Sequence, residues 1–376
     1  MDKKERNIAW INKIINSDVS GKNGLSILPD KCIDCIVTSP PYFGLRDYGL
    51  EPTEWPEIKY NLFGFEIVVP AMTCCLGLEK TPKDFVGHIV HVFRLARPIL
   101  KDEGTLWLNF GDSYCSTAPG TMGDGLRQHG ILSGVSDSCS ESRRKFRPKT
   151  PEGLKPKDLI GIPWMVAFAL RGDGWFLRQE NIWAKAYSTL HENFGSVMPE
   201  SVTDRFVKSH EHVFLLSKSN KYYFDLESIK KDIKESSQKR LDQNVSDQNG
   251  SARVPGKTNG NMKAVVNNKM ARNGTNVVGH SGDIQGGLTA NKRSVWHHNP
   301  SNFSEAHFAT FPQELIVDCI KAGSRVDGIV LDPFMGAGTT ALVARKLNRN
   351  YIGFELNPKY IEIAKKRIYN ELGAFA

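Results

Sequence analysis

The stretch Val330-Leu331-Asp332-Pro333-Phe334-Met335-Gly336-Ala337-Gly338-Thr339-Thr340-Ala341 decides the fold class. Its first residues are apolar and predict a buried strand, and a helical pattern begins at Thr339 and runs to Leu347. A second strand (351–355) and a second helix (358–372), capped by Asn357, follow directly. This strand–helix–strand–helix order predicts an α/β fold whose doubly wound, mostly parallel sheet carries helices on both faces.

The glycine loop in this stretch predicts a cofactor site. Gly336-x-Gly338-x-x-Ala341 matches a dinucleotide fingerprint, and Glu355 ends the next strand, where a ribose-binding carboxylate is expected. A plain tight turn is the alternative. Asp332, at the strand end, would repel a pyrophosphate but suits a cationic or amine-bearing ligand. The loop therefore favours S-adenosylmethionine over NAD.

A second motif, Thr38-Ser39-Pro40-Pro41-Tyr42-Phe43, follows an apolar run (33–37) that predicts another buried strand. Neither proline can donate a ladder hydrogen bond, so the strand has to end there. The carbonyl groups of Ser39 and Pro40 are then free of sheet pairing, beside a hydroxyl group and an aromatic ring. Such a corner can accept hydrogen bonds from an amine while Tyr42 stacks on a flat group.

The remaining pattern predicts further strands and helices around these two motifs. Thr81-Pro82-Lys83-Asp84 is a helix start, with a capping Thr and Pro at the first helical position. Residues 44–80 show no regular pattern, and 101–104 predict a turn. The other expected elements are helices at 82–98, 158–170 and 311–320, the last stopping at Gly323, and strands at 105–110, 176–183, 211–218 and 221–225.

Length and composition exclude several classes of protein. The 376 residues allow one large domain with insertions or two domains. There is no run of eighteen apolar residues, and the charged N-terminus leads to no apolar core of a signal peptide, so we expect a cytoplasmic protein. Seven cysteines, an odd number, argue against a disulfide framework. A four-thiolate zinc site could in principle be formed by Cys32, Cys35, Cys74 and Cys75. The preferred interpretation is that Cys32 and Cys35 are small apolar residues packed in or beside the 33–37 strand, so no metal is expected.

The net charge of +8 is concentrated in two segments. Residues 141–157 hold seven Lys/Arg against two acids, and residues 230–300 hold twelve against five. Neither segment has the apolar pattern of a core, so both predict loops that reach for a polyanion, with solvated loops as the alternative. The residues expected to contact DNA are Arg143, Arg144, Lys145 and Arg147.

With both motifs in view, the chain resembles the amino-group DNA methyltransferases, which act on N4 of cytosine or N6 of adenine. The resemblance rests on Ser39-Pro40-Pro41-Tyr42 and on Phe334-Met335-Gly336-Ala337-Gly338, in the order of the permuted β group. It covers most of 16–115, 158–225 and 303–372. Supporting stretches are Leu100–Asn109, Met198–Arg205, Ser209–His212 and His307–Pro312. Residues 186–197 and 230–300 depart from the family pattern.

The resemblance implies a Rossmann-like, S-adenosylmethionine-dependent methyltransferase fold with loop-rich DNA-recognition insertions. It implies a catalytic half (1–229, with a basic insertion at 115–157), a recognition or flexible segment (230–300) and a cofactor-binding half (301–376). Duplex DNA is the expected substrate, and a cognate restriction endonuclease acting separately is an expected companion. The implied catalytic residues are Ser39, Pro40, Pro41 and Tyr42, and the implied cofactor-binding residues are Asp18, Thr310, Phe311, Asp332, Phe334, Gly336, Gly338 and Glu355.

The mechanism implied by the resemblance starts with a base flipped from the duplex into the pocket. Hydrogen bonds from its exocyclic amine to Ser39 and the Pro40 carbonyl would localise the nitrogen lone pair. Tyr42 would stack on the base, with Phe43 as a second ring. Asp18 would contact the adenine region of the cofactor, unless it only caps a helix. Ser39 favours cytosine N4, since Asp is more typical of adenine-N6 enzymes; adenine N6 is the alternative.

Overall fold

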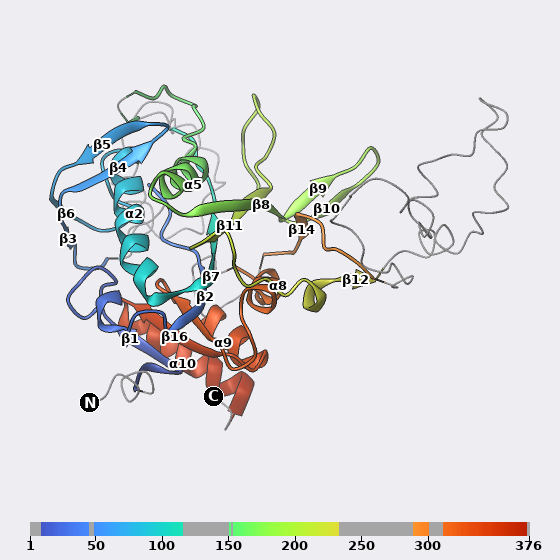
Figure 1. The fold of residues 1–376 in the computed structure, drawn as a ribbon. Helices are drawn as coiled ribbons and strands as arrows, with labels where there is room; N and C mark the ends of the chain where they lie inside the picture. Colours follow the sequence, from blue (N-terminus) through green and yellow to red (C-terminus); the bar gives the residue numbers. More distant parts are fainter. Residues whose placement is uncertain are drawn as a thin grey trace, which may run out of the picture. The chain divides into compact units, whose positions relative to one another are not determined.

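The computed structural model describes residues 9–44, 49–115, 150–151, 153–232, 289–300 and 311–373 (Figure 1). The chain forms two compact units. One comprises Met1–Asp225 with Ser294–Ala376, and the other comprises Leu226–Arg293. Within the described ranges, no helix combines the length and apolar character that a membrane crossing requires.

The first unit is built on one large sheet, whose strand order is β1-β16-β15-β2-β7-β11-β8-β14 among the described residues. Every neighbouring pair is parallel except the two pairs made by β11. The sheet is therefore mostly parallel, which confirms the predicted fold class. The strands are β1 (Lys13–Asn16), β2 (Ile33–Thr38), β7 (Leu100–Phe110), β8 (Phe176–Ala184), β11 (His210–Ser217), β14 (Val295–His297), β15 (Ile329–Asp332) and β16 (Asn350–Glu355).

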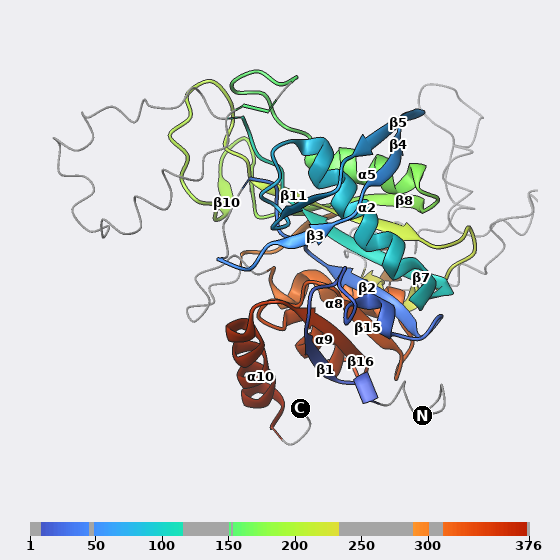
Figure 2. The ribbon, with the colours of Figure 1, turned by 90° about the vertical axis from the view of Figure 1, so that its left-hand side faces the viewer.

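Helices cover both faces of this sheet, because its central strands are apolar on both sides. On one face, Ile36, Leu106 and Leu108 pack into a core shared with α2 (Pro82–Ile99) and α5 (Ile162–Gly172). On the other face, Cys35 and Trp107 lie against Gly323 of α8 (Gln313–Gly323), which has no room for a side chain. Figure 2 shows α2 and α5 on one side of β2 and β7, with α8 and α9 (Thr339–Lys346) on the other. The last helix, α10 (Pro358–Leu372), begins at the predicted Asn357 cap, whose side chain accepts from Lys359 N.

Residues 44–80 were expected to be irregular, and this prediction was wrong. They form two antiparallel pairs: β3 (Thr53–Trp55) with β6 (Met72–Cys74), and β4 (Ile58–Leu62) with β5 (Phe65–Val69). In β4, buried Ile58 and Tyr60 alternate with exposed Lys59 and Asn61, a two-residue period masked by the neighbouring prolines.

The predicted turn at 101–104 is also wrong, because β7 is continuous from Leu100 to Phe110. Ile33 of β2 pairs with Leu100 of β7, and Cys35, two residues later, pairs with Thr105, five residues later. The intervening residues 101–104 of β7 therefore form a bulge within the strand. Residues 221–225 do not form the predicted strand; Tyr223 N and Asp225 N instead donate singly to Glu103 O and Ala322 O.

Helix α5 begins at Ile162 rather than at Asp158. Gly161 precedes it with a φ of 85°, and the Asp112 carboxylate accepts from the backbone N–H groups of Gly161 and Ile162. A distant acid therefore caps this helix, which local sequence does not reveal.

The second unit is described at its two ends only. A short 3₁₀ helix, η2 (Glu227–Ile229), is followed by β12 (Lys231–Asp232), which pairs antiparallel with β13 (Thr289–Ala290). Residues 233–288, most of the predicted recognition segment, lie outside the described part of the chain.

Candidate active site

The two sequence motifs meet at one edge of the sheet. β2 and β15 are neighbouring parallel strands, so their carboxyl ends, at Thr38 and Asp332, lie side by side. The Ser39–Tyr42 corner leaves the first strand and the glycine loop leaves the second. Both line a pocket of about 300 Å³. Residues separated by nearly 300 positions thus form one site.

A buried hydrogen-bond network joins the two motifs. Asp332 Oδ1 accepts from Thr38 Oγ1 at 2.6 Å and from Phe334 N at 3.0 Å, and its Oδ2 accepts from Thr340 Oγ1 at 2.6 Å. The residue is 1% exposed, and burial raises the pKa of its carboxyl to about 6, although these hydrogen bonds oppose the shift. Asp332 lines the pocket, but its oxygens are engaged by the protein, so it holds the two loops together.

The glycine loop presents Gly336 to the pocket and Gly338 to a helix. Gly336 has a φ of 51°, and a Cβ there would meet open space apart from Phe334 O at 4.0 Å. Its N–H donates to Glu355 Oε2 at 2.8 Å. Gly338 has a φ of 78°, and a Cβ there would lie 2.8 Å from the Cβ of Ala364 in α10. Phe334, Gly336 and Glu355 are pocket-lining residues, whereas Gly338 serves the packing of α9 against α10.

The expected cofactor acids lie in the same pocket. Glu355 Oε1 also accepts from Asn357 N at 2.8 Å, and burial raises the pKa of its carboxyl. Asp18, just after β1, also lines the pocket; Ser20 N donates to its Oδ1 at 2.8 Å, and Thr53 Oγ1 donates to its Oδ2. Phe311 also lines the pocket. Thr310 and the four expected DNA contacts, Arg143, Arg144, Lys145 and Arg147, lie outside the described residues.

The Tyr42 side chain is held in place by several contacts at the Ser39–Tyr42 corner. Its hydroxyl donates to Glu211 Oε2 at 2.7 Å and accepts from Ser39 Oγ at 3.3 Å. Burial and the Glu211 charge raise the pKa of this phenol well above its usual value, so it stays protonated. A Cβ on Gly111 would come within 2.7 Å of the Tyr42 ring, so only glycine fits beside it.

Phe43, expected as a second stacking ring, does not face the pocket. It is 2% exposed and packs against Phe85 of α2, with 5.7 Å between ring centroids. That prediction was wrong, because the Phe43 ring is part of the buried core under α2 and is not among the pocket-lining residues.

Sequence reasoning missed one wall of the pocket. It comes from the ends of β7, β8 and β11 and consists of Asn109, Trp183, Lys185 and Glu211. The Lys185 ammonium forms an ion pair with Glu211 and lies 4.7 Å from the centroid of the Trp183 ring. Two family-like stretches contain Asn109 and Glu211. The pairing of β7 with β2 brings Asn109 to Tyr42, and the register of antiparallel β11 on β7 brings Glu211 there.

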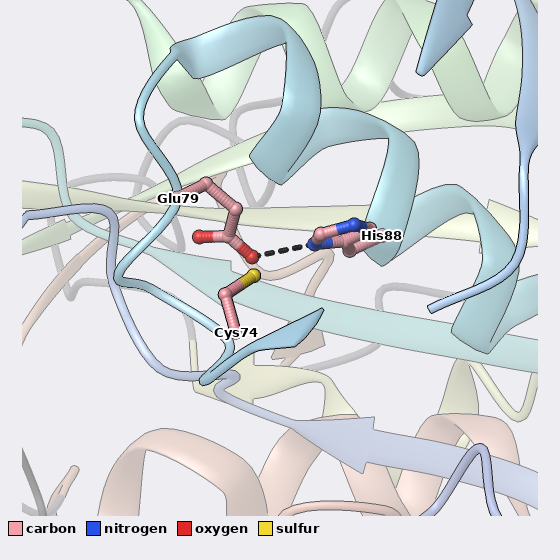
Figure 3. Close-up of side chains that lie close together, drawn as sticks. All are labelled: Cys74, Glu79 and His88. Carbon is pink, nitrogen blue, oxygen red and sulfur yellow. Dashed lines mark hydrogen bonds and ion pairs between the residues drawn. The ribbon is translucent and has the colours of Figure 1, made fainter. Parts of the chain in front are cut away.

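Two buried side chains, Glu79 and His88, form a hydrogen-bonded pair (Figure 3). His88 Nδ1 and Glu79 Oε1 are 2.7 Å apart, and Glu79 Oε2 accepts from Gly77 N at 2.8 Å. Gly77 O accepts from Gly44 N, and a Cβ on Gly77 would lie 3.0 Å from Tyr42 O. Burial raises the pKa of the Glu79 carboxyl. The pair therefore fixes the loop against which the Pro-Pro-Tyr backbone packs.

The sulfur of Cys74 completes a close group with this pair, in which one ligand-type atom from each residue lies within 4.8 Å of the others. The 2.7 Å between His88 Nδ1 and Glu79 Oε1 is a hydrogen-bond length, so these two atoms are paired with one another, whereas the buried Nε2 of His88 has no hydrogen-bond partner among the described residues. Cys35 lies on the α8 face of the sheet and Cys74 beside α2, so the four thiols considered for zinc do not gather.

Comparisons with known proteins identify the family. A family model described as a DNA methylase, of the N6/N4 methyltransferases, matches residues 33–366. The type II methyltransferase M.SmaI of Serratia marcescens is 38% identical over 356 residues, covering 95% of this chain and 90% of that protein. M.Cfr9I of Citrobacter freundii, also a type II methyltransferase, is 36% identical over 345 residues, covering 92% and 84%.

A solved structure shares the fold. The PvuII DNA methyltransferase, described as cytosine-N4-specific, superposes with a TM-score of 0.51 at 16% identity, covering 96% of this chain and 91% of that one. At this identity the likeness concerns the fold alone. The family match and the two close relatives carry the assignment: the chain belongs to the N6/N4 DNA methylase family and is a DNA methyltransferase.

Proposed function

We propose that the enzyme transfers a methyl group from S-adenosylmethionine to the exocyclic N4 amine of a cytosine flipped out of duplex DNA. One observation carries this proposal. The amine-accepting corner at Ser39–Tyr42 and the glycine loop at 333–337 line the same pocket. A methyl donor on the loop and an amine at the corner would therefore be neighbours, and alignment of two reactants lowers the barrier.

The pocket residues fit S-adenosylmethionine. The open space over Gly336 would take the methionine part, beside Phe334. Glu355 keeps lone pairs beyond those used by Gly336 N and Asn357 N, so it can accept from ribose hydroxyls. Asp18 and Trp55 also line the pocket, and an adenine ring would fit beside them. When bound, this cofactor supplies an electrophilic methyl group on a sulfonium.

The corner residues prepare the amine. The exocyclic amine is a poor nucleophile because its lone pair is delocalised into the ring. Hydrogen bonds to Ser39 Oγ and the Pro40 carbonyl would hold its protons and localise the lone pair towards the glycine loop. Tyr42, fixed by Glu211 and Phe110, offers a ring for the base. No protein nucleophile is required.

Two features favour cytosine over adenine. Ser39 stands where the family resemblance associates serine with cytosine N4. Lys185 lines the pocket beside Asn109, Trp183 and Glu211. Its ammonium donates to Glu211 and retains further N–H groups. An ammonium there could donate to O2 of cytosine, whereas adenine has only a C–H group at the corresponding position of its ring.

The experiment is methylation of duplex DNA with tritiated S-adenosylmethionine, followed by digestion to nucleosides and mass analysis. We expect N4-methylcytosine; N6-methyladenine would refute the choice of base. Methyl transfer to RNA or protein but not to duplex DNA would refute the substrate. Ser39→Ala should abolish transfer while cofactor binding persists, and Ser26→Ala, at an exposed serine, is the matched control. Sequencing modified bases in DNA from expressing cells would give the target sequence, and with it the site that a separate restriction endonuclease would share.

A further inference from the structure

Residues 186–208 leave the sheet between β8 and β11, directly beside the pocket. Lys185 and Glu211, which bracket this segment, both line the pocket. Lys185 N donates to Ser209 O at 2.8 Å, so the segment leaves and re-enters the sheet at neighbouring positions. It is therefore rooted at the pocket edge, and it includes residues 186–197, which the family pattern does not explain.

This segment carries the most exposed large apolar side chains of the described residues. Phe206 is 97% exposed, Leu190 96% and Met198 84%. One exposed leucine would need no explanation. Three such side chains in one segment at the edge of a substrate pocket indicate a surface that meets a partner.

Leu190 differs from the other two because it sits at the tip of a hairpin. Strands β9 (Ala186–Ser188) and β10 (Asn193–Gly195) pair antiparallel, and Figure 1 shows this hairpin extending from the end of β8. Its turn is closed by Thr189 N donating to Glu192 O at 2.8 Å and by Glu192 N donating to Thr189 Oγ1 at 3.1 Å.

The hairpin is braced along its length. The rings of Tyr187 and Phe194 stack at 4.9 Å, and His297 of β14 packs edge-on against Tyr187 at 5.1 Å. Gly195 has a φ of 82°, and a Cβ there would lie 2.2 Å from Lys185 O, so glycine is required where the hairpin returns to the sheet. Because the backbone of the hairpin is already ordered by these contacts, the exposed Leu190 at its tip can contact a partner with little further loss of conformational entropy by the hairpin.

We propose that residues 186–195 form a DNA-inserting finger, and that Leu190 enters the duplex and occupies the space left by the flipped base. This inference rests on the proposed function, since it presumes base flipping. Flipping costs a few kcal/mol of unstacking and unpairing. Apolar side chains are known to enter DNA between base steps, and a side chain in the vacated space would restore contacts to the neighbouring bases. The tip carries a carboxylate, Glu192, so its attraction to DNA is apolar rather than electrostatic.

The test compares the wild type with Leu190→Ala on duplexes that carry the target sequence with fluorescent pyrrolocytosine at the flipped position. Val326→Ala is the matched control, because Val326 is 59% exposed and lies before the amino end of β15, away from the carboxyl ends of the strands that line the pocket. Both duplexes used first have an intact opposing strand. On the pyrrolocytosine duplex we expect Leu190→Ala to lower the fluorescence rise by about tenfold, and on the duplex with ordinary cytosine we expect the single-turnover methylation rate to fall by about tenfold, as for loss of one contact to a base. Cofactor affinity should be unchanged.

A further duplex, with an abasic site opposite the target, separates insertion from a purely structural effect. Removing the opposing base lowers the cost of flipping, so the deficit of Leu190→Ala should shrink to less than about twofold. A deficit that persists on this duplex, or no deficit on the intact one, would overturn the proposal. So would a change in sedimentation of Leu190→Ala, since it would assign the tip to a contact between protein copies. Failure of the wild type itself to methylate duplex DNA would instead refute the proposed function.

Discussion

Adding one methyl group at Gly338 should destabilise the protein by about 2–5 kcal/mol. Gly338 has a φ of 78°, and placing an L-residue in that region costs about 1–2 kcal/mol. The new Cβ would also lie 2.8 Å from the Cβ and 3.2 Å from the Cα of Ala364, so α10 would have to shift. Overpacking of this kind costs about 1–3 kcal/mol. The two costs add, because one is local to the backbone and the other lies between helices.

Gly336→Ala is the matched control, two residues earlier in the same loop. Its φ of 51° carries a similar backbone cost, but its Cβ would meet only open pocket space. We therefore expect a loss of about 1–2 kcal/mol in stability, with the larger effect on cofactor binding. Urea unfolding would measure the free energies, and calorimetric titration with S-adenosylhomocysteine would measure affinity. Gly338→Ala as stable as the wild type, or Gly336→Ala binding with wild-type affinity, would refute this division of roles.

Three other predictions follow from buried polar groups. The pKa of Asp332 is raised from 3.8 to about 6, so the folded protein loses stability as the pH rises from about 4 to 6 and this buried carboxyl ionises. Asp332→Asn lacks this ionisation, so its free energy of unfolding, measured in urea, should rise by up to about 3 kcal/mol relative to that of the wild type between pH 4 and 7. Thr38→Val removes a donor to that carboxylate and should cost about 1–3 kcal/mol by the same assay, a prediction contradicted by unchanged stability. Glu79→Ala leaves His88 buried without its partner and should cost about 3–5 kcal/mol, whereas Glu79→Gln, which can still accept from Gly77 N, should cost less; equal losses would contradict the Gly77 contact.

Local sequence was sufficient where one element carries its own signal. The helix start at Thr81, the Asn357 cap and the glycine loop are each defined by neighbouring residues, and the structure confirms them. The adjacency of the two motifs also follows from sequence, because carboxyl ends of parallel strands share an edge.

The remaining site residues depend on contacts between distant segments. Glu211 reaches Tyr42 only through the pairing of β11 with β7. Asp112 caps a helix fifty residues further on, and Glu79 acts through the backbone of Gly77. The roles of Gly336 and Gly338 differ because one faces a pocket and the other faces α10, which no fingerprint distinguishes.

The order of strands in the sheet has a consequence for synthesis of the enzyme. β1 (Lys13–Asn16) pairs with β16, so it cannot join the sheet until β16 has been synthesised more than 300 residues later. For almost as long, β2 lacks its neighbour β15. At about 5–20 residues per second, that interval lasts on the order of tens of seconds. During translation β2, which bears the Ser39–Tyr42 corner, has one open side, and the pocket cannot assemble on the ribosome until β15 and β16 emerge. Methylation activity should therefore appear only after β16 has been synthesised, and a chain ending before β15 would expose the edge of β2 to aggregation.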